Sequence, residues 1–351
     1  MPPESLPDTS DRSAARSAGL RYVHDGQPGI RRVGRGKRVG YVDSDGSRIT
    51  DDSELQRIRQ LAVPPAYERV WICADARGHI QATGRDARGR KQYRYHSDWR
   101  VLRDSHKYER LLVFGQALPA IRRRIALELA VPGLSVQKMV AAVVWLLDHT
   151  TIRIGNEAYA RDNASFGLTT LRRRHVQVKG ARVELKFRGK SGVGHAAVIA
   201  DARVVKVLRA CLEVPGQELF STVDDSGEPR SIGSGHINDW LRQELAEADD
   251  AFTAKDFRTW HGSVRALKLL RELPPADSET AQRGQIAEVI REVAARLNNT
   301  AAVCRKCYVH PQILQDWREG CLPDAPTAPR GLDADERRLL ALLRKTRGVR
   351  A

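Results

Sequence analysis

Hydrophobic and polar positions alternate in short runs over residues 20–99, which is the period of strands that bury one face. The runs at 38–42, 70–73 and 79–83 are separated by turn residues such as Asp, Gly and Ser. One stretch, 53–61, has a helical period and stops before two prolines, which cannot continue a helix. The pattern predicts a small β-rich region with one short helix.

The pattern changes after residue 100, where apolar positions recur at helical spacing over 105–130 and 136–150. Ser135 precedes the second helix and is a predicted N-cap, because its hydroxyl can accept a hydrogen bond from a free backbone N–H. Alternation then returns in three runs joined by glycine-containing turns, which predicts a three-stranded antiparallel sheet. These runs are 175–178, 181–187 and 195–199.

Helical spacing dominates the rest of the chain. The predicted class is α+β, with a small β-rich N-terminal domain and a larger, mostly helical domain that contains the small three-stranded antiparallel sheet. Residues 1–18 are mostly Ser, Pro, Asp and Arg, so we expect a disordered tail. We place the domains at 19–100 and 101–322, followed by a linker and a charged helix over 323–351. The later helices are predicted at 201–212, 236–248, 263–273, 281–299 and 333–345.

The net charge of the chain suggests a class of ligand. The chain has 351 residues, with 59 Lys and Arg against 43 Asp and Glu, and a net charge of +16. Such a charge favours polyanions, because cationic side chains release condensed counterions from nucleic acid. Basicity alone is also typical of an Arg-rich soluble protein, and it says nothing about fold.

The apolar runs, the first residues and the cysteines bear on the cellular compartment of the protein. The longest apolar run, 139–147, is too short to span a bilayer, and the first residues lack the features of a signal peptide. The five cysteines are odd in number and irregularly spaced, so they do not indicate a disulfide framework. We therefore expect a cytoplasmic protein with reduced thiols.

Two short motifs suggest cofactors and fail when their spacing is checked. Residues 189–191 match the end of a phosphate-binding P-loop, but Glu184 stands where its first Gly is required, and a strand follows instead of a helix. Cys304 and Cys307 lie near His310 but lack a second well-spaced pair to complete a zinc site. We therefore expect no metal and no cofactor.

Five polar residues of the larger domain are candidates for chemistry. Arg153 sits at the end of an apolar helix, Lys190 at the tip of a predicted hairpin, and Arg258 near the start of another helix. Asn299 and Tyr308 follow near the end of this domain. Each alone has an ordinary explanation: a helix-end cation, a solvated turn lysine, or a packed tyrosine whose hydroxyl is merely hydrogen-bonded.

Together and in this order, these residues resemble the type IB DNA topoisomerases, in particular the compact bacterial members similar to the poxvirus enzyme. The resemblance covers nearly all of 20–320. In the small domain it is carried by the segment 84–95. In the larger domain it is carried by Ile152-Arg-Ile-Gly-Asn, Phe187-Arg-Gly-Lys190, Lys255-Asp-Phe-Arg258-Thr and Lys306-Cys-Tyr308-Val.

The resemblance implies a role for each residue. Tyr308 would be the nucleophile that forms a 3′-phosphotyrosine, and Arg153 and Arg258 would hold the scissile phosphate. Lys190 would be the general acid that protonates the leaving 5′ oxygen. Asn299 stands where poxvirus-like members have histidine; it can donate a hydrogen bond to a phosphate oxygen, but it cannot exchange a proton near neutral pH.

The resemblance also implies a partner, double-stranded DNA, bound by a monomer associated with the nucleoid, whose two domains (19–100 and 101–322) close on the duplex. The small domain would be a DNA clamp and the larger one the catalytic domain. Tyr159, one helical turn beyond Arg153, and Lys255 are further candidates for DNA contacts. The clamp contacts would come from Arg85, Arg90, Lys91, Gln92, Tyr93 and Tyr95.

The chemistry calls for these residue types independently of the resemblance. Attack on a phosphodiester concentrates negative charge on the non-bridging oxygens, where many enzymes use Mg²⁺. Two guanidiniums can serve instead, because each stays charged and donates a planar fork of hydrogen bonds. A phosphotyrosine keeps the energy of the phosphodiester bond, so resealing needs no nucleotide. These expectations agree with the missing P-loop.

Two other functions remain open at this point. A tyrosine recombinase or integrase uses the same residue types, but such enzymes usually begin with a helical domain, whereas residues 20–99 are predicted to be β-rich. A non-catalytic DNA-binding clamp would also be basic. It would not need Arg153, Lys190, Arg258 and Tyr308 together.

Overall fold

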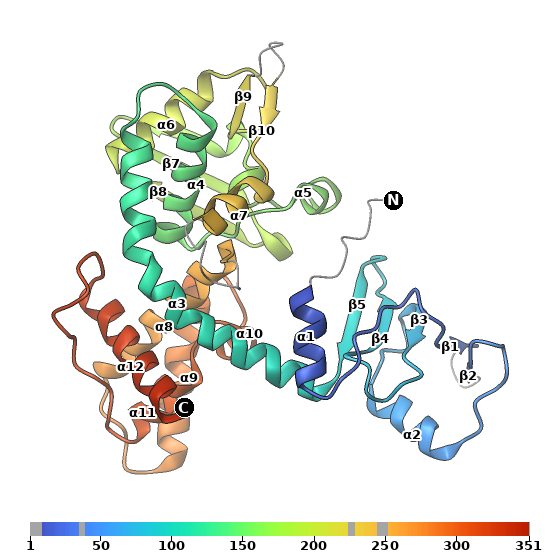
Figure 1. The fold of residues 1–351 in the computed structure, drawn as a ribbon. Coiled ribbons are helices and arrows are strands. Elements are labelled where there is room, and N and C mark those ends of the chain that lie inside the picture. Colours follow the sequence, from blue (N-terminus) through green and yellow to red (C-terminus); the bar gives the residue numbers. More distant parts are fainter. Residues whose placement is uncertain (1–8, 35–38, 224–228, 244–251, 351) are drawn as a thin grey trace. The chain divides into compact units, whose positions relative to one another are not determined.

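The computed structural model of this chain describes residues 9–34, 39–223, 229–243 and 252–350 (Figure 1). It divides into two compact units, Met1–Lys107 and Tyr108–Ala351. The chain passes from the first unit to the second within one helix, α3 (Ser97–Ala130). The N-terminal unit is β-rich and the C-terminal unit is mostly helical, so the predicted α+β class is confirmed.

A five-stranded antiparallel sheet organises the first unit. Its strand order is β2-β1-β3-β4-β5, and the helix α2 (Asp52–Gln60) packs its Ile58 side chain into the core beneath the sheet. Asp51 caps this helix by accepting a hydrogen bond from the backbone N–H of Glu54 at 2.7 Å. The strands are β1 (Ile30–Val33), β2 (Gly40–Val42), β3 (Glu68–Ile72), β4 (Ile80–Arg85) and β5 (Lys91–Tyr95).

The disordered tail predicted for residues 1–18 is wrong for its second half. Residues 9–17 form the helix α1 (Thr9–Ser17), and residues 1–8 lie outside the described part of the chain. The helix is held because Ala15 is fully buried in a small cluster with Leu20 and Trp99. The polar composition of residues 1–18 gave no sign of these few apolar contacts, because they involve residues far apart in the sequence.

The second unit has one large hydrophobic core built by helices. Ser135 caps α4 (Val136–Thr150) as predicted, accepting from the backbone N–H of Lys138 at 3.2 Å. Another central helix, α8 (Ala254–Arg271), packs against α4 and several later helices (Figure 1). The remaining helices are α5 (Glu157–Asn163), α6 (Ala202–Glu213), α7 (Ser234–Gln243), α9 (Glu279–Arg296), α10 (Ala301–Cys307), α11 (Pro311–Arg318) and α12 (Ala334–Arg350).

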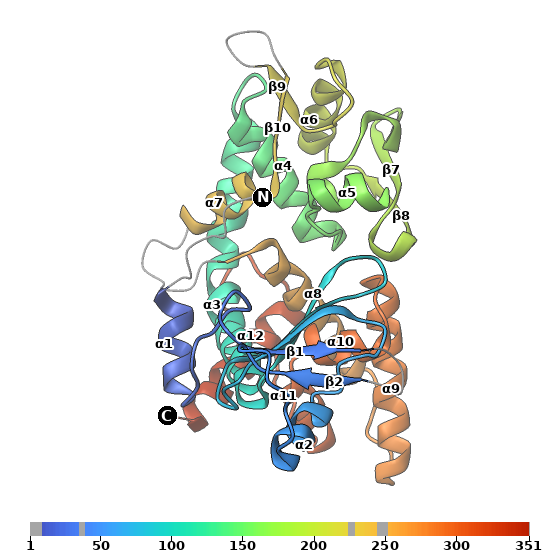
Figure 2. The same ribbon diagram turned by 90° about the vertical axis from the view of Figure 1, so that its right-hand side faces the viewer.

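The predicted three-stranded antiparallel sheet is confirmed, with strand order β6-β7-β8. Every second residue of β7 is buried, and α6 packs against this strand (Figure 2). The strands are β6 (Val176–Lys179), β7 (Arg182–Arg188) and β8 (Gly194–Ile199), and a separate hairpin pairs β9 (Ser221–Val223) with β10 (Pro229–Ser231).

Helix boundaries differ from the predictions where local turns or caps intervene. α8 begins at Ala254 rather than 263, because the Asp256 carboxylate accepts from the Thr253 backbone N–H at 2.8 Å and from its hydroxyl at 3.0 Å and so fixes the helix start. The helix predicted over 236–248 is observed as α7 up to Gln243, and residues 244–248 lie outside the described ranges. Within those ranges, no helix combines the length and apolar character that a membrane crossing requires.

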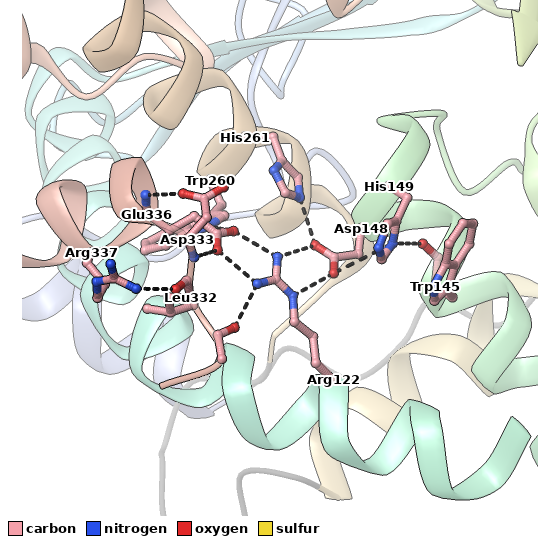
Figure 3. Close-up of polar contacts among 11 residues, drawn as sticks. Arg122, Trp145, Asp148, His149, Trp260, His261, Leu332, Asp333, Glu336 and Arg337 are labelled. Carbon is pink, nitrogen blue, oxygen red and sulfur yellow. Dashed lines mark hydrogen bonds and ion pairs between the residues drawn. The ribbon is translucent and has the colours of Figure 1, made fainter. Parts of the chain in front are cut away.

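A buried network of charges joins four helices of the second unit (Figure 3). Arg122 of α3 pairs with Asp148 of α4 at 2.8 Å and with Glu336 of α12 at 2.8 Å. Asp148 also bonds His261 of α8 at 2.8 Å, and Glu336 accepts from the indole of Trp260 at 3.1 Å. The network therefore ties the C-terminal helix and α8 to the end of α4, close in sequence to Arg153.

Candidate active site

The loop that follows α4 carries Arg153. The helix ends because Thr151 adopts a left-handed conformation, with φ of 56°. The next residues pack against the segment around Gly167, where an added Cβ would lie 2.6 Å from the Arg153 carbonyl oxygen. Only a glycine fits there, and the backbone N–H of Leu168 donates to that same carbonyl at 2.9 Å. Arg153 is thus fixed in the loop directly after α4, and the predicted end of that helix at residue 150 is confirmed.

The helix α8 carries Arg258, whose side chain is 3% exposed. Its Nη1 donates to the carbonyl of Thr151, and its Nη2 donates to the carbonyl of Leu297 at 2.6 Å. The guanidinium therefore bridges the Arg153 loop and the end of α9. Its Nε is buried and has no hydrogen-bond partner among the described residues.

A sharp corner between α9 and α10 presents Asn299. Asn298 takes a left-handed conformation with φ of 48°, and the backbone N–H groups of Asn298 and Asn299 bond the carbonyls of Ala295 and Ala294 at 3.1 and 2.9 Å. This is the Schellman pattern that ends many helices, and Thr300 then caps α10. The short sequence Leu-Asn-Asn-Thr therefore sets the position of the Asn299 side chain.

Both arginines converge on this corner. Arg153 Nη2 donates to the Asn299 side-chain oxygen and, at 3.3 Å, to the Asn298 carbonyl. The Asn299 amide nitrogen is buried and lacks an acceptor within the described ranges. Buried donors are almost always paired, so Arg258 Nε and Asn299 Nδ2 can each take an acceptor that the described residues do not supply.

Tyr308 lies at the end of α10 against α8 and is 9% exposed. An added Cβ on Gly262 would lie 2.7 Å from the Tyr308 carbonyl oxygen, so a glycine is needed for this approach. Ser263 donates to the same carbonyl at 3.2 Å and accepts from the His310 backbone N–H at 3.1 Å. The Arg258 guanidinium is 5.2 Å from the centre of the Tyr308 ring.

The site holds more positive charge than its surroundings balance. No carboxylate forms an ion pair with Arg153 or Arg258 among the residues that the structure describes. Burial, followed by the charge of Arg153, lowers the pKa of Arg258, and burial also lowers the pKa of Arg153. Both remain charged because an arginine starts above 12. The site is therefore poised to accept an anion.

Lys190 lies outside the group formed by the two arginines, Asn299 and Tyr308. It lies on the exposed turn between β7 and β8, where Gly189 donates to the Val193 carbonyl at 2.8 Å. Four of the five predicted site residues (Arg153, Arg258, Asn299 and Tyr308) are thus linked by contacts, whereas Lys190 lies on the exposed hairpin turn.

One residue of the site was missed by the sequence analysis. His195 of β8 lies opposite Phe187 of β7 and stacks on its ring, with centroids 5.0 Å apart. Its Nδ1 is 3.1 Å from the side-chain nitrogen of Asn298. Burial, and then the charges of Arg153 and Arg258, lower the pKa of His195. The hairpin register was the signal available, since a tight turn after Arg188 places His195 across from Phe187.

The predicted DNA contacts of the first unit lie mostly on β5. Lys91, Tyr93 and Tyr95 share the exposed face of this strand, and the two tyrosine rings stack with centroids 5.8 Å apart. Arg85 ends β4 and donates to the Gly89 carbonyl at 2.7 Å. Gln92 alternates to the other face of β5 and donates to Asp86 at 3.1 Å.

Part of the positive charge on this surface is balanced. Arg90 pairs with Asp86 at 2.7 Å, and Lys91 pairs with Asp25 at 2.8 Å. Exposed pairs of this kind are weak, typically below about 1 kcal/mol, so a phosphate can replace the carboxylate at little cost.

The two remaining contact candidates lie in the second unit. Lys255 is exposed at the start of α8, one turn before Arg258. Tyr159 is half-buried on α5, a separate helix from α4, so its predicted place one helical turn beyond Arg153 is wrong. The left-handed Thr151 and the loop after it end α4 first. Tyr159 still lies close enough to Arg153 to influence the pKa of that arginine.

The Cys304–Cys307 pair is not part of a three-ligand cluster in the described part of the chain. Cys304 is buried, and burial raises the pKa of its thiol to about 11. Within the described ranges, one group could offer three ligands, Asp316, Glu319 and Cys321, and it does not include the Cys304–Cys307 pair.

Two family models match the chain. The model described as the catalytic core of eukaryotic DNA topoisomerase I matches residues 96–321. The model described as the N-terminal domain of bacterial DNA topoisomerase IB matches residues 38–86. The first match contains all five predicted site residues.

DNA topoisomerases of viruses and fungi are similar in sequence to this chain. The DNA topoisomerase 1B of Acanthamoeba polyphaga mimivirus is 28% identical over 289 residues, which cover 80% of this chain and 85% of the viral protein. The DNA topoisomerase 1B of vaccinia virus (strain Copenhagen) is 23% identical over 285 residues, covering 76% and 83%. The DNA topoisomerase 1 of Schizosaccharomyces pombe is 26% identical over 173 residues, covering 49% and 20%.

Proposed function

The chain belongs to the type IB DNA topoisomerases, and from this membership we propose that it relaxes supercoiled DNA through a covalent 3′-phosphotyrosine at Tyr308. One observation carries the proposal. Two arginines without carboxylate partners within the described ranges lie near Tyr308, and the site holds two buried unpaired donors, Arg258 Nε and Asn299 Nδ2. A DNA phosphate supplies the negative charge and the acceptor oxygens that this arrangement lacks.

The cleavage step follows from these positions. The Tyr308 hydroxyl gives its proton to solvent and its oxygen attacks phosphorus, so that the tyrosine–phosphorus bond forms while the bond to the 5′ oxygen breaks. Arg153 and Arg258 donate to the non-bridging oxygens, where charge develops. Preorganised donors of this kind are each worth roughly 3 kcal/mol in the transition state.

Lys190 supplies the proton that the leaving 5′ oxygen needs. Its exposed place on the β7–β8 turn leaves the ammonium free to reach a bound duplex. The strand with the free 5′ hydroxyl can then rotate, and attack of this hydroxyl on the phosphotyrosine reverses the step. No nucleotide enters the cycle, because the phosphotyrosine conserves the bond energy.

Asn299 would donate its unpaired amide N–H to a non-bridging oxygen while its side-chain oxygen accepts from Arg153. If it acts only as a donor, Asn299→His keeps substantial activity. Asn299→Ala then lowers the cleavage rate by roughly 10²–10³-fold, the usual loss for such a donor. An alanine variant with the wild-type cleavage rate would remove Asn299 from the site.

The first unit would grip the duplex through the face of β5 that carries Lys91, Tyr93 and Tyr95. Lysine and arginine bind backbone phosphates, and tyrosine can pack against sugars and base edges. Its five-stranded sheet is unlike the helical N-terminal domain usual in tyrosine recombinases, which supports relaxation by a monomer over recombination by a tetramer.

A direct test is the incubation of the full chain with supercoiled plasmid in EDTA, without ATP. Because two guanidiniums perform the charge stabilisation that Mg²⁺ provides elsewhere, we expect supercoils of either sign to relax. An absolute requirement for Mg²⁺ or ATP would contradict the mechanism.

The affinity of the protein for DNA should also fall steeply between about 50 and 200 mM salt, as for other proteins held by phosphate contacts.

A further inference from the structure

The general acid and the phosphate-binding groups come from different parts of the second unit. Lys190 lies on the β7–β8 turn, whereas Asn299 and Tyr308 lie on the α9–α10 corner and the end of α10. Proton transfer to the leaving oxygen requires these parts to keep a fixed spacing, since a displacement of about 1 Å can cost about 10²-fold in rate.

His195 connects the two parts. On one side its ring packs against the turn, because an added Cβ on Gly189 would lie 2.5 Å from the imidazole. Gly189 directly precedes Lys190 in the chain. On the other side, His195 Nδ1 is 3.1 Å from the side-chain nitrogen of Asn298, which directly precedes Asn299.

Stacking and one hydrogen bond orient the ring, and its surroundings favour the neutral form. Stacking on Phe187 at an interplanar angle of 4° fixes its plane. The Asn298 amide nitrogen is a donor, so His195 Nδ1 accepts and its proton resides on Nε2. Burial and the charges of Arg153 and Arg258 lower the pKa of His195, which favours this neutral form.

We propose that His195 is a positioning residue that clamps the Lys190 turn to the Asn298–Asn299 corner and so aligns the general acid with the scissile phosphate. It transfers no proton itself. The proton given to the 5′ oxygen comes from Lys190. His195 fixes the position of the backbone turn from which the Lys190 side chain extends. This inference rests on the proposed function, in which Lys190 is the acid.

The experiment measures single-turnover cleavage of two duplexes, one ordinary and one with a 5′-bridging sulfur at the scissile phosphate. A thiolate leaves without protonation, so it needs no general acid. We expect His195→Ala to cleave ordinary DNA about 10- to 100-fold more slowly than wild type. It should cleave the sulfur substrate at nearly the wild-type rate for that substrate. Equal slowing on both substrates would overturn the proposal.

Two variants distinguish the loss of the hydrogen bond between Asn298 and His195 from a general loss of folding. His195→Asn keeps an acceptor near the position of Nδ1 and should recover most of the rate. Asn298→Gly keeps the left-handed conformation but removes the donor, so it should repeat the behaviour of His195→Ala even if that variant folds poorly. Wild-type cleavage of ordinary DNA by Asn298→Gly would contradict the clamp.

Two controls complete the design. Val198→Ala alters the same strand at a side chain that is 60% exposed, and we expect no change on either substrate. In the double variant Lys190→Ala/His195→Ala, the loss should equal that of Lys190→Ala alone, because His195 acts through the lysine. Additive losses would contradict this route.

Failure of the inference and failure of the proposed function give different results. If sulfur does not rescue Lys190→Ala, the general-acid assignment of the proposed function is wrong. If sulfur rescues Lys190→Ala but not His195→Ala, only the clamp is wrong.

Discussion

The second unit contains two buried arginine sites that differ in how their charge is balanced. Arg122 faces two carboxylates, Asp148 and Glu336, both almost fully buried, and against the lowering effect of burial these raise its pKa (Figure 3). Arg258 is more deeply buried than Arg122, and its guanidinium donates to the carbonyls of Thr151 and Leu297, with no carboxylate paired to it in the described part of the chain. Its pKa is lowered by burial and by Arg153.

The difference separates a site built for stability from a site built for binding. A balanced cation has no need of a ligand, whereas adjacent cations without counterions are stable only because the surrounding structure holds them. The two sites share elements, since α4 and α8 contribute to both. The balanced network therefore holds the helices that keep the unbalanced arginines together.

The largest expected effect is on stability. Arg122→Met leaves Asp148 and Glu336 buried without their cation, so we expect a loss of about 3–5 kcal/mol in the free energy of unfolding. Arg258→Met should cost clearly less, because it removes an unbalanced charge and leaves no carboxylate unpaired. Chemical denaturation at pH 7 measures both. Equal losses would break the comparison.

Activity should rank the two sites in the opposite order. Arg258→Ala removes donors to the non-bridging oxygens, so DNA cleavage should fall by roughly 10²–10³-fold with non-covalent binding largely kept. Glu336→Gln retains the shape of the network and should change the rate far less at a temperature where the variant is folded. Single-turnover cleavage of a defined duplex is the measurement. A slower reaction in Glu336→Gln than in Arg258→Ala would refute the division of roles.

The pH dependence of stability sharpens the comparison. Hydrogen bonds and the charges of Arg122 and His261 hold the pKa of Asp148 below its usual range, against the opposing effect of burial, and Arg122 likewise lowers that of Glu336. A lowered folded pKa contributes stability above the unfolded value near 4, and this contribution is lost as pH falls. The stability gap between wild type and Arg122→Met should therefore shrink below about pH 4. A gap that stays constant from pH 7 to pH 3 would contradict the charge pairing.

The smallest effect concerns free anions. Inorganic phosphate should stabilise the wild-type protein through Arg153 and Arg258, by an amount that grows with the logarithm of concentration and stays near 1 kcal/mol for weak binding. Thermal unfolding at constant ionic strength, with chloride as the control anion, tests this. Arg258→Met should lose the response and Arg122→Met should retain it at its lower melting temperature.

The sequence predicted what depends on local pattern. The α+β class, the three-stranded sheet and the Ser135 cap follow from periodicity and turn residues, and Arg258 and Tyr308 were proposed as site residues from ordered motifs. The helix α1 was missed, because its burial depends on Trp99, far along the chain.

The site residues show the same limit. Lys190 and Asn299 could be named from motifs, but the hydrogen bond between His195 and Asn298 joins residues about a hundred positions apart. Charge balance is likewise invisible in sequence, since Arg122 and Arg258 are the same residue type and only their neighbours in space differ.

The central claim is that the unbalanced arginines hold a DNA phosphate for attack by Tyr308. It is tested most directly by trapping the covalent protein–DNA adduct in EDTA and mapping the modified peptide by mass spectrometry. The account predicts a single phosphotyrosine at Tyr308, absent from Tyr308→Phe, which should still bind DNA. An adduct on another tyrosine, or one that persists in Tyr308→Phe, would contradict it.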